Sequence, residues 1–324
     1  MSSQRDSGIR YVMMNMQVLD KFSNSLGLNS KFLEKDVRIH QLLIKISNST
    51  YLRSNLVFKG GTCLVKAYIP HYRFSEDIDF GWRDQTGWEG ASAKFTEKLC
   101  LEETKRIIGE MKKISDELGL QFNPSIDEKV DVFINSGGTR LAIHLNYNSR
   151  ISGEKDRVKM EVNFLDYCIY PFVENKLESI LSKLGTDAKF LFPEIDKYRQ
   201  PVVLNCYSVK EIFVEKVRAS LTREQYKIRD TIDMAMIQST FNLDLYDYEE
   251  DAYEKIKFAV KRFSRYLNNL QGQPLPEIEK QLEKEMILLI IQRPKDPFTW
   301  PSCRGMPRSR RAPRPAAWVC TPRG

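Results

Sequence analysis

NLVFKGGTCLVKAY, residues 55–68, opens the part of the sequence that decides the fold. Residues 55–59 are a short apolar run that predicts a strand, and they lead through Gly60-Gly61 into a helix-compatible stretch at 62–68. After a loop, DIDFGW at 77–82 predicts a second strand. We therefore expect a glycine turn between a strand and a helix, with another strand close by.

The sequence around these strands predicts further helices and strands. Residues 34–47 place their apolar side chains broadly on one side of a helix with charges opposite, which indicates an amphipathic surface helix. A long charged helix is expected at about 91–118. Strands are expected at 130–135 and 140–147, which form a hairpin across a glycine-rich turn, and at 158–165 and 202–206. The expected fold is α/β (α+β), a small mixed sheet with helices against it.

The chain divides into three predicted parts. Residues 1–207 form an α/β domain with N-terminal helices, and 208–292 form an all-helical domain that starts at a capping box of Ser208 and Glu211. Residues 293–324 hold half of the 14 prolines and an excess of positive charge that equals the chain's net +7. We expect this tail to be disordered, and its abrupt change of composition also suits a non-native end. A basic arm that touches nucleic acid is the alternative.

Composition is that of an ordinary soluble globular protein, with 42% hydrophobic and 29% charged residues. No apolar run approaches the roughly 18 residues that a membrane span needs, so no membrane contact is expected. The six cysteines include no C-x-x-C pair, which argues against a zinc site or a redox motif. A reducing cytoplasm is the expected location.

Asp77 and Asp79 are the strongest chemical signal. Strand side chains alternate with a period of two, so both carboxylates leave one face while Ile78 and Phe80 point into the core. Adjacent carboxylates repel each other unless a cation lies between them, and an oxygen-only pair suits Mg²⁺ or Mn²⁺ together with substrate phosphates. The alternative is a solvated strand edge, since D-x-D also occurs by chance.

Gly60-Gly61 would place a phosphate site next to this metal site. Glycines allow close approach of the backbone, and the start of the following helix contributes N–H groups. A purely structural turn is the alternative.

A third carboxylate is expected at Glu161. In the strand predicted at 158–165 it alternates with apolar residues, and it shares its side with other polar groups. An exposed strand glutamate is an equal alternative, and Asp131 is a weaker candidate because it lies near a strand start.

Lys216 and Arg223 are the candidate triphosphate ligands of the helical part. They are seven residues apart, which places them within about 20° on one helix face. Two cations on one face could neutralise a triphosphate, whereas a solvated face paired with Glu211 and Glu215 is the alternative.

Other polar residues carry weaker signals. Arg229 and Asp233 are spaced as an i,i+4 pair that a structural helix could use. His71 is the histidine closest to the motif loop, and a lone histidine is more often structural than catalytic. A basic patch that includes Lys227 could serve RNA although residues 1–292 carry no net charge; its other members are Lys210, Lys216, Arg218, Arg223 and Arg229.

Two blocks of sequence resemble the AbiEii/AbiGii family of toxin-like nucleotidyltransferases. FKGGTCL at 58–64 and RFSEDIDF at 73–80 are similar to the family signature, with Cys63 where alanine is usual. EKVRA at 215–219, with Arg223 and the segment 229–233, looks like the family's helical motif. The resemblance spans about residues 30–240.

The resemblance implies a polymerase-β-like nucleotidyltransferase core that uses an NTP and a divalent metal. It implies that Gly60, Gly61, Thr62 and Ser75 contact phosphates and that Asp77, Asp79 and Glu161 bind metal. Lys216 and Arg223 would meet the triphosphate, and Asp230 would be a further active-site acid.

We therefore expect a metal-dependent nucleotidyltransferase that moves NMP from an NTP to an acceptor hydroxyl. The resemblance implies that the acceptor is RNA, the tRNA 3′ end, and that the protein is the toxin of a toxin–antitoxin or phage-abortive-infection system with a cognate antitoxin. The alternatives are a non-catalytic NTP-binding module, and a transferase that acts on a protein or a small molecule.

Overall fold

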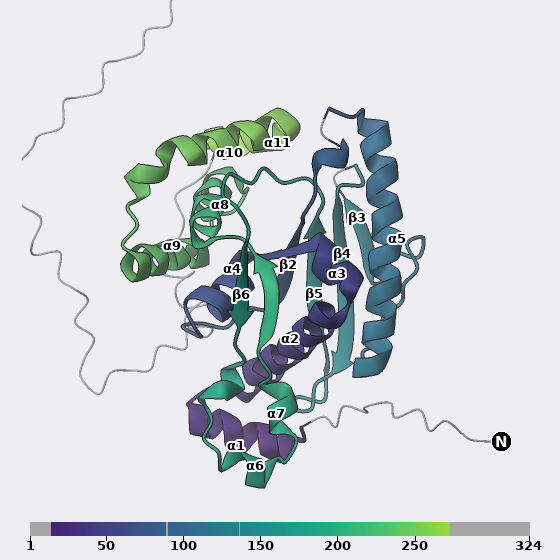
Figure 1. Cartoon of the computed structure of the whole chain (residues 1–324), viewed down its shortest axis with the longest axis vertical. Coiled ribbons are helices and arrows are strands. Elements are labelled where there is room, and N and C mark those ends of the chain that lie inside the picture. Colours follow the sequence, from purple (N-terminus) through teal and green to yellow (C-terminus); the bar gives the residue numbers. More distant parts are fainter. Residues whose placement is uncertain (1–13, 89, 136, 273–324) are drawn as a thin grey trace, which may run out of the picture. The chain divides into compact units, whose positions relative to one another are not determined.

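The computed structural model describes residues 14–272 apart from 89 and 136. Within them, seven strands form one mixed sheet in the order β3-β4-β5-β2-β1-β7-β6 (Figure 1). β1 and β2 are antiparallel, whereas β2 pairs with β5, and β1 with β7, in parallel. The strands are β1 (Leu56–Lys59), β2 (Asp77–Trp82), β3 (Val132–Asn135), β4 (Arg140–Asn148), β5 (Lys155–Asn163), β6 (Val173–Leu177) and β7 (Val202–Cys206).

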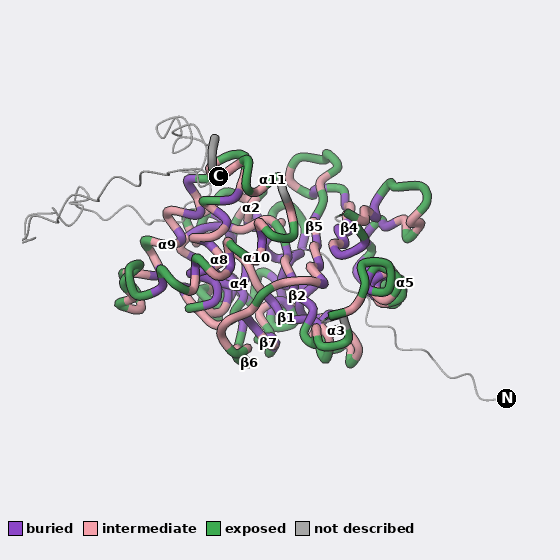
Figure 2. The backbone as a smooth tube through the Cα atoms, turned by 90° about the horizontal axis from the view of Figure 1, so that it is seen from above, coloured by how far each residue is buried: buried purple, intermediate pink, exposed green. Residues whose placement is uncertain are grey.

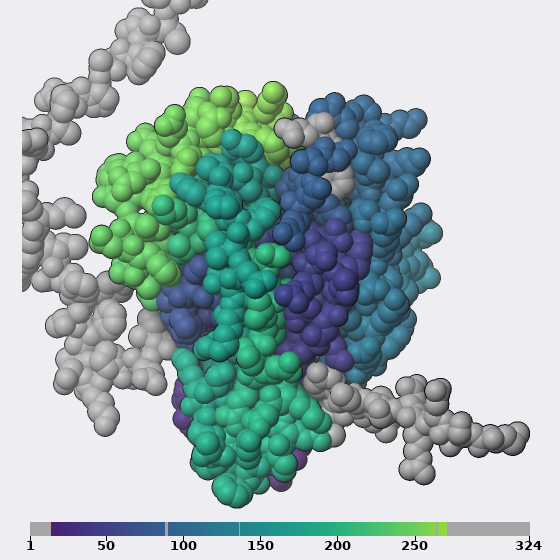
Figure 3. Space-filling model, in the orientation of Figure 1, coloured from purple at the N-terminus to yellow at the C-terminus, as the bar shows by residue number. Residues whose placement is uncertain are grey.

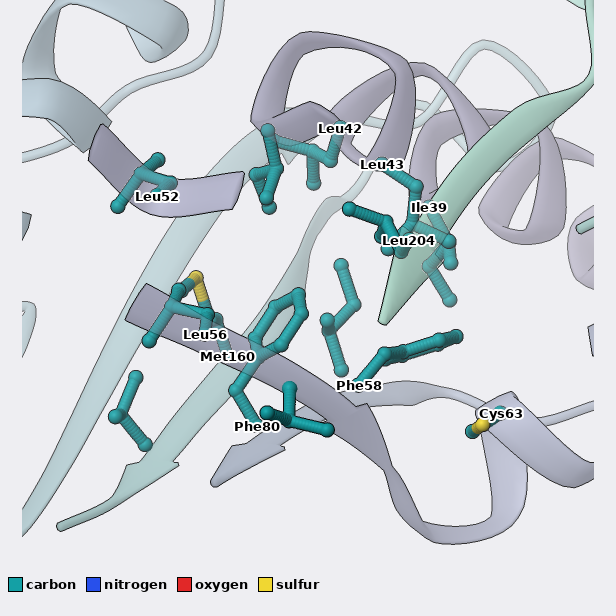
Figure 4. Close-up of a cluster of buried hydrophobic side chains, with 14 of the residues drawn as sticks. Ile39, Leu42, Leu43, Leu52, Leu56, Phe58, Cys63, Phe80, Met160 and Leu204 are labelled. Carbon is teal, nitrogen blue, oxygen red and sulfur yellow. The ribbon is translucent and has the colours of Figure 1, made fainter. Parts of the chain in front are cut away.

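One face of the sheet holds the main core. Ile78, Phe80 and Met160 belong to the same buried cluster as Leu42 of α2 and Ile107 of α5, and Figure 4 shows part of this packing between α2, β1 and β2. α5 is exposed on its outer side, whereas the central strands are buried (Figure 2). The helices before β3 are α1 (Met16–Leu26), α2 (Ser30–Asn48), α3 (Thr50–Asn55), α4 (Gly60–Cys63) and α5 (Ala93–Leu118).

Most of the predicted elements are confirmed. The strands at 77–82 and 202–206, the hairpin of β3 and β4, and the long helix α5 lie where the pattern placed them. β5 begins and ends a few residues earlier than predicted. β6 was not predicted, because its sequence VENKL is mostly polar and lacks the apolar run that marks a strand.

The prediction that residues 34–47 form a surface helix is wrong, because α2 is buried on nearly all sides. It packs against β5, β7, α1 and α5, and its charged side chains have internal partners. Glu34 pairs with Arg38 at 3.2 Å, and Asp36 pairs with Lys66 at 2.8 Å. The charges that suggested a solvated face are therefore neutralised inside the protein.

Four helices follow β7 and lie together on one side of the described structure, seen in green and yellow-green in Figures 1 and 3. Ser208 caps the first of them, with its Oγ accepting from Glu211 N at 3.2 Å. The Glu211 carboxylate does not complete the capping box, because it accepts from the backbone of Ile169 and Tyr170 and pairs with Lys255. The four helices are α8 (Val209–Thr222), α9 (Ile228–Phe241), α10 (Glu249–Arg262) and α11 (Ser264–Gly272).

The predicted domain boundary at 207/208 stays a prediction. The predicted end of the helical domain and the tail at 293–324 lie outside the described residues. The short elements between β5 and β7, apart from β6, are η3 (Ile180–Lys183), α6 (Ala188–Leu191) and α7 (Ile195–Tyr198); the remaining short helices are η1 (Leu64–Tyr68), η2 (Thr86–Trp88) and η4 (Leu245–Tyr248).

We expect Asp36→Asn to lower the free energy of unfolding by about 3–5 kcal/mol, because it leaves the fully buried Lys66 ammonium without its counter-charge. Urea denaturation measures the change. The double variant Asp36→Leu/Lys66→Met, which removes both charges, should recover most of the loss. An Asp36→Asn variant as stable as the wild type would contradict this account of the pair.

Candidate active site

Three carboxylates stand on the same face of the sheet, opposite the main core. Asp79 of β2 stands beside Glu161 of β5 in the parallel register, and Asp77 stands beside Lys159. Ile78 and Phe80 are buried on the other face. The alternation of strand side chains therefore directs all three acids outward, as the sequence predicted for each strand.

The electrostatics of the three acids differ. Burial, Glu161 and Asp77 raise the pKa of Asp79 to about 6. Burial and Glu161 also raise the pKa of Asp77. Although burial opposes it, Arg140 at 3.2 Å and Lys159 lower the pKa of Glu161. The negative charges of Asp77 and Asp79 are thus unfavourable in the folded protein, whereas the charge of Glu161 is compensated by Arg140 and Lys159.

Asp77 and Asp79 fit a divalent cation. Within the described part of the chain, neither carboxylate has an ion-pair or side-chain hydrogen-bond partner. Mg²⁺ commonly takes one or two carboxylates and completes its shell with water and phosphate oxygens. Within the described residues, no group of three His, Cys, Asp or Glu side chains is arranged to hold a metal ion. Glu161 as a metal ligand stays a prediction, since it would have to turn from Arg140 and Lys159.

Gly60 and Gly61 are needed for close packing at this site. Gly60 has a φ of +78°, and a Cβ there would lie 2.5 Å from Asp79 Oδ2. A Cβ at Gly61 would collide with the Arg73 guanidinium. Larger residues would therefore displace the acid and the arginine. Phosphate contact by the two glycines stays a prediction.

Thr62 and Ser75 join the glycine turn to the loop before β2. The buried Thr62 hydroxyl donates to the carbonyl oxygen of Asp77 and lies 2.8 Å from Ser75 Oγ. Thr62 therefore fixes the start of the strand that carries the two acids. The predicted phosphate contact of Thr62 would require its hydroxyl to leave this bond.

A buried ion-pair network connects the loop before β2 with α9. The Arg73 guanidinium donates twice to Asp233, from Nε and from Nη2, each at 2.7 Å. Asp233 also accepts from Tyr72 and pairs with Lys216 at 2.6 Å. Although burial opposes it, Lys216 and Arg73 hold the pKa of Asp233 far below its usual value. The i,i+4 pairing of Arg229 with Asp233 is therefore wrong, because Asp233 faces inward.

The same network holds Lys216, Asp230 and Arg223. Lys216 Nζ lies 2.7 Å from Asp230 Oδ1, and Arg223 pairs with the other oxygen of Asp230. The alternative in which Lys216 pairs with Glu211 and Glu215 on a solvated face is wrong. Lys216 is 9% exposed and lies between two aspartates. The predicted roles of Lys216, Arg223 and Asp230 toward a triphosphate stay predictions.

Two cations that carried only a weak signal interact electrostatically with Asp77. The positive charge of Arg229 lowers the pKa of Asp77. Lys227 is attracted by Asp77 and repelled by Arg229. Burial, Arg223 and Arg229 together lower the pKa of Lys227. No carboxylate within 4 Å pairs with either cation among the described residues. Both add positive potential at Asp77, which the sequence indicated only as part of a broader basic patch.

The weaker acid candidate and the candidate histidine lie away from the paired acids. Asp131 accepts from Asn123 N and from Asn146 Nδ2, which is a structural role. His71 is buried, and burial together with Lys66 lowers its pKa to about 4. Lys59, which had no predicted role, is the last residue of β1, where it stands opposite Asp79 in the antiparallel register and pairs with Asp166.

Paired strand carboxylates next to a glycine turn, with cations at the edge, suit the transfer of a phosphate-bearing group and are typical of a nucleotidyltransferase. The sequence matches the family model described as the AbiEii nucleotidyl transferase toxin of type IV toxin–antitoxin systems over residues 42–299. The chain belongs to this family. It is a nucleotidyltransferase, and its family implies an antitoxin as partner.

Two solved structures from Helicobacter pylori are distant neighbours. The protein JHP933 is 16% identical, with a TM-score of 0.40, over 80% of this chain and 91% of its own. A protein described as a proposed nucleotidyltransferase is 18% identical, with a TM-score of 0.36, over 85% of this chain and 94% of its own. No curated protein matches the sequence. In the part of the chain that the structure describes, no helix is both long and apolar enough to cross a membrane.

We expect Asp79→Asn to stabilise the metal-free protein at about pH 8 by about 1–3 kcal/mol, since one pKa unit corresponds to about 1.4 kcal/mol. The folded pKa lies above the usual value, so the wild type loses stability as pH rises from about 4 to about 6. The variant should lack that loss. Thermal unfolding in EDTA across this range measures it, and equal pH profiles for the two proteins would contradict it.

We expect Asp233→Asn to lower the free energy of unfolding by about 3–5 kcal/mol, because Arg73 would remain buried without a full counter-charge. Asp244→Asn is the matched control, since Asp244 is exposed and an asparagine there keeps the hydrogen bond to Tyr246 N. Chemical denaturation compares them. Similar losses in both variants would refute a special role for the buried network.

Proposed function

We propose that this protein moves a nucleoside monophosphate from an NTP to a hydroxyl of RNA, at the 3′ end of tRNA. The acceptor oxygen bonds to the α-phosphorus, the bond from that phosphorus to the oxygen bridging to the β-phosphate breaks, and pyrophosphate leaves. The acceptor's proton passes to solvent. The observation that carries the proposal is the pair Asp77 and Asp79, two carboxylates without a partner among the described residues in a chain of this family.

Asp77 and Asp79 would hold the divalent metal, Mg²⁺ or Mn²⁺. When bound, such an ion neutralises phosphate charge and supports the charge that develops during transfer. The raised pKa of both acids supports this assignment, because each carboxylate gains from a nearby positive charge. Glu161 is proposed as a third ligand that exchanges Arg140 and Lys159 for the metal.

The NTP phosphates would lie on the side of Asp77 that faces Arg229 and Lys227. These cations can bind phosphate without first breaking a carboxylate pair, whereas Lys216 is enclosed by Asp230 and Asp233. We therefore propose that Lys216 acts mainly by positioning the two aspartates. Arg223, whose side chain is 39% exposed, remains able to reach a triphosphate.

The biological role follows from the family and the proposed acceptor. Adding a nucleotide to the tRNA 3′ end would stop aminoacylation there. This suits a toxin that acts in the cytoplasm and that serves abortive infection, a defence against phage. The antitoxin would have to limit this activity. A protein or small-molecule acceptor, and a non-catalytic NTP-binding module, are outcomes of the test below.

We expect wild-type protein to label tRNA from at least one α-³²P NTP with Mg²⁺ or Mn²⁺, and EDTA to stop the reaction. Asp77→Asn/Asp79→Asn should lower the rate by at least about a thousandfold, because both metal ligands lose their charge. Asp84→Asn is the matched control. Asp84 is an exposed acid just after β2, and asparagine there keeps the bond to Thr86 N.

Each other result would correct a part of the proposal. Label in protein or in a small molecule, but not in RNA, would replace the acceptor. NTP binding without transfer to any acceptor would indicate the non-catalytic module. Equal labelling by the wild type and the double variant would exclude the two aspartates as the metal site.

A further inference from the structure

An open groove of about 520 Å³ lies next to Glu161. We propose that this acceptor groove binds the phosphate backbone of a single-stranded RNA segment close to the hydroxyl that accepts the nucleotide. The inference rests on the proposed function and adds the surface that holds its acceptor. Sheet residues Asn135, Arg140 and Glu161 line the groove on one side, and Arg262, Phe263 and Arg265 line it on the other.

The sheet order places the groove on one side of the paired acids. β2 carries Asp77 and Asp79, and its two neighbours are β1 and β5. Gly60 follows β1, whereas the groove extends from Glu161 on β5 across β4 to Asn135 on β3. A nucleotide at the glycine turn would therefore approach the acids from the β1 side of β2. An RNA strand in the groove would approach them from the β5 side. Transfer needs this arrangement, because the attacking and leaving oxygens lie roughly in line.

The groove has more positive than negative charge. Arg140, Arg262 and Arg265 face a single carboxylate, Glu161. Arg262 and Arg265 are exposed, and neither pairs with an acid among the described residues. Because residues 1–292 have no net charge, this excess is a local feature of the surface. Such an excess attracts a polyanion and makes its binding depend on salt.

Arg140, which lines the groove, has a buried donor without an acceptor in the described part of the chain. Its Nη2 contacts Glu161 at 3.2 Å, but its buried Nε has no hydrogen-bond acceptor among the described residues. Burial of a donor without a partner is unfavourable, so this Nε would gain a hydrogen bond if the side chain turned toward an acceptor in the groove. A phosphate oxygen fits, because guanidinium groups bind phosphate through two parallel hydrogen bonds.

Aromatic rings next to these arginines favour a nucleic-acid strand over a small anion. Arg265 lies over the rings of Tyr266 and Phe263, with its guanidinium carbon 5.1 and 5.7 Å from their centroids. Arginine and aromatic side chains together are the usual contacts of single-stranded RNA, whose bases stack while phosphates pair. The groove is also open, whereas small-molecule acceptors are commonly enclosed.

The test compares Arg262→Glu/Arg265→Glu with Lys257→Glu/Lys261→Glu in the full chain. Both double variants change the charge equally, and the control lysines are exposed on α10 but do not line the groove. Fluorescence anisotropy with a labelled single-stranded RNA ending in CCA, without NTP, gives Kd at several salt concentrations. Arg262→Lys/Arg265→Lys keeps the charge and serves as a second check. Thermal shift with NTP and Mg²⁺ confirms an intact nucleotide site.

We expect the groove variant to raise the Kd for RNA at least about tenfold and to reduce the salt slope by about 1.4, which is two lost phosphate contacts at about 0.7 each. The control variant and the lysine variant should bind within about threefold of the wild type. All four proteins should show the same NTP-dependent shift. Unchanged RNA affinity and salt slope in the groove variant would overturn the inference.

Labelling of tRNA separates this inference from the proposed function. If the groove variant labels tRNA as fast as the wild type under limiting RNA, the groove is not the acceptor site, while nucleotidyl transfer to RNA stands. A second outcome is that the wild type labels no RNA while only the groove substitutions weaken RNA binding. In that case the groove binds RNA, and the proposed RNA acceptor is wrong.

Discussion

The buried pair of Arg73 and Asp233 is the interaction on which the site depends. It joins the loop before β2 to α9, and Lys216 of α8 shares the same carboxylate. Gly61 has to be a glycine because the Arg73 guanidinium fills the space of its side chain. The glycine turn, the strand with the two acids and two helices are thereby held in one arrangement. A buried pair of this kind is costly to break, since either partner alone would be left with an uncompensated charge.

The paired acids show the opposite balance. Asp77 and Asp79 are held near each other and near Glu161, without partners in the described part of the chain, and their pKa values rise accordingly. The rest of the sheet has to supply the stability that this repulsion removes, and the large cluster on the other face does so. Local instability at a functional site is a common cost of function. The proposed nucleotide and acceptor sites would then have separate positive surfaces, one near Arg229 and one in the acceptor groove.

Sequence patterns predicted what depends on near neighbours. The two-residue period put Asp77 and Asp79 on one face, and Ser208 correctly marked the start of α8. The patterns failed where the partner is distant in sequence. α2 looked like a surface helix because nothing nearby reveals Lys66 as the partner of Asp36, and the i,i+4 rule could not reveal that Asp233 pairs with Arg73. That Glu161 stands beside Asp79 depends on the pairing of β2 with β5, which alternation alone cannot give.

The distance along the chain between Arg73 and Asp233 also has a consequence during synthesis. A ribosome makes proteins from the N-terminus, so the paired acids leave it long before α9 exists. β1 likewise has to wait for β7, its parallel partner, before both of its edges are paired. A nascent or prematurely ended chain therefore cannot close the site. In this member of a toxin family, the candidate site is therefore completed only after α9 has been made.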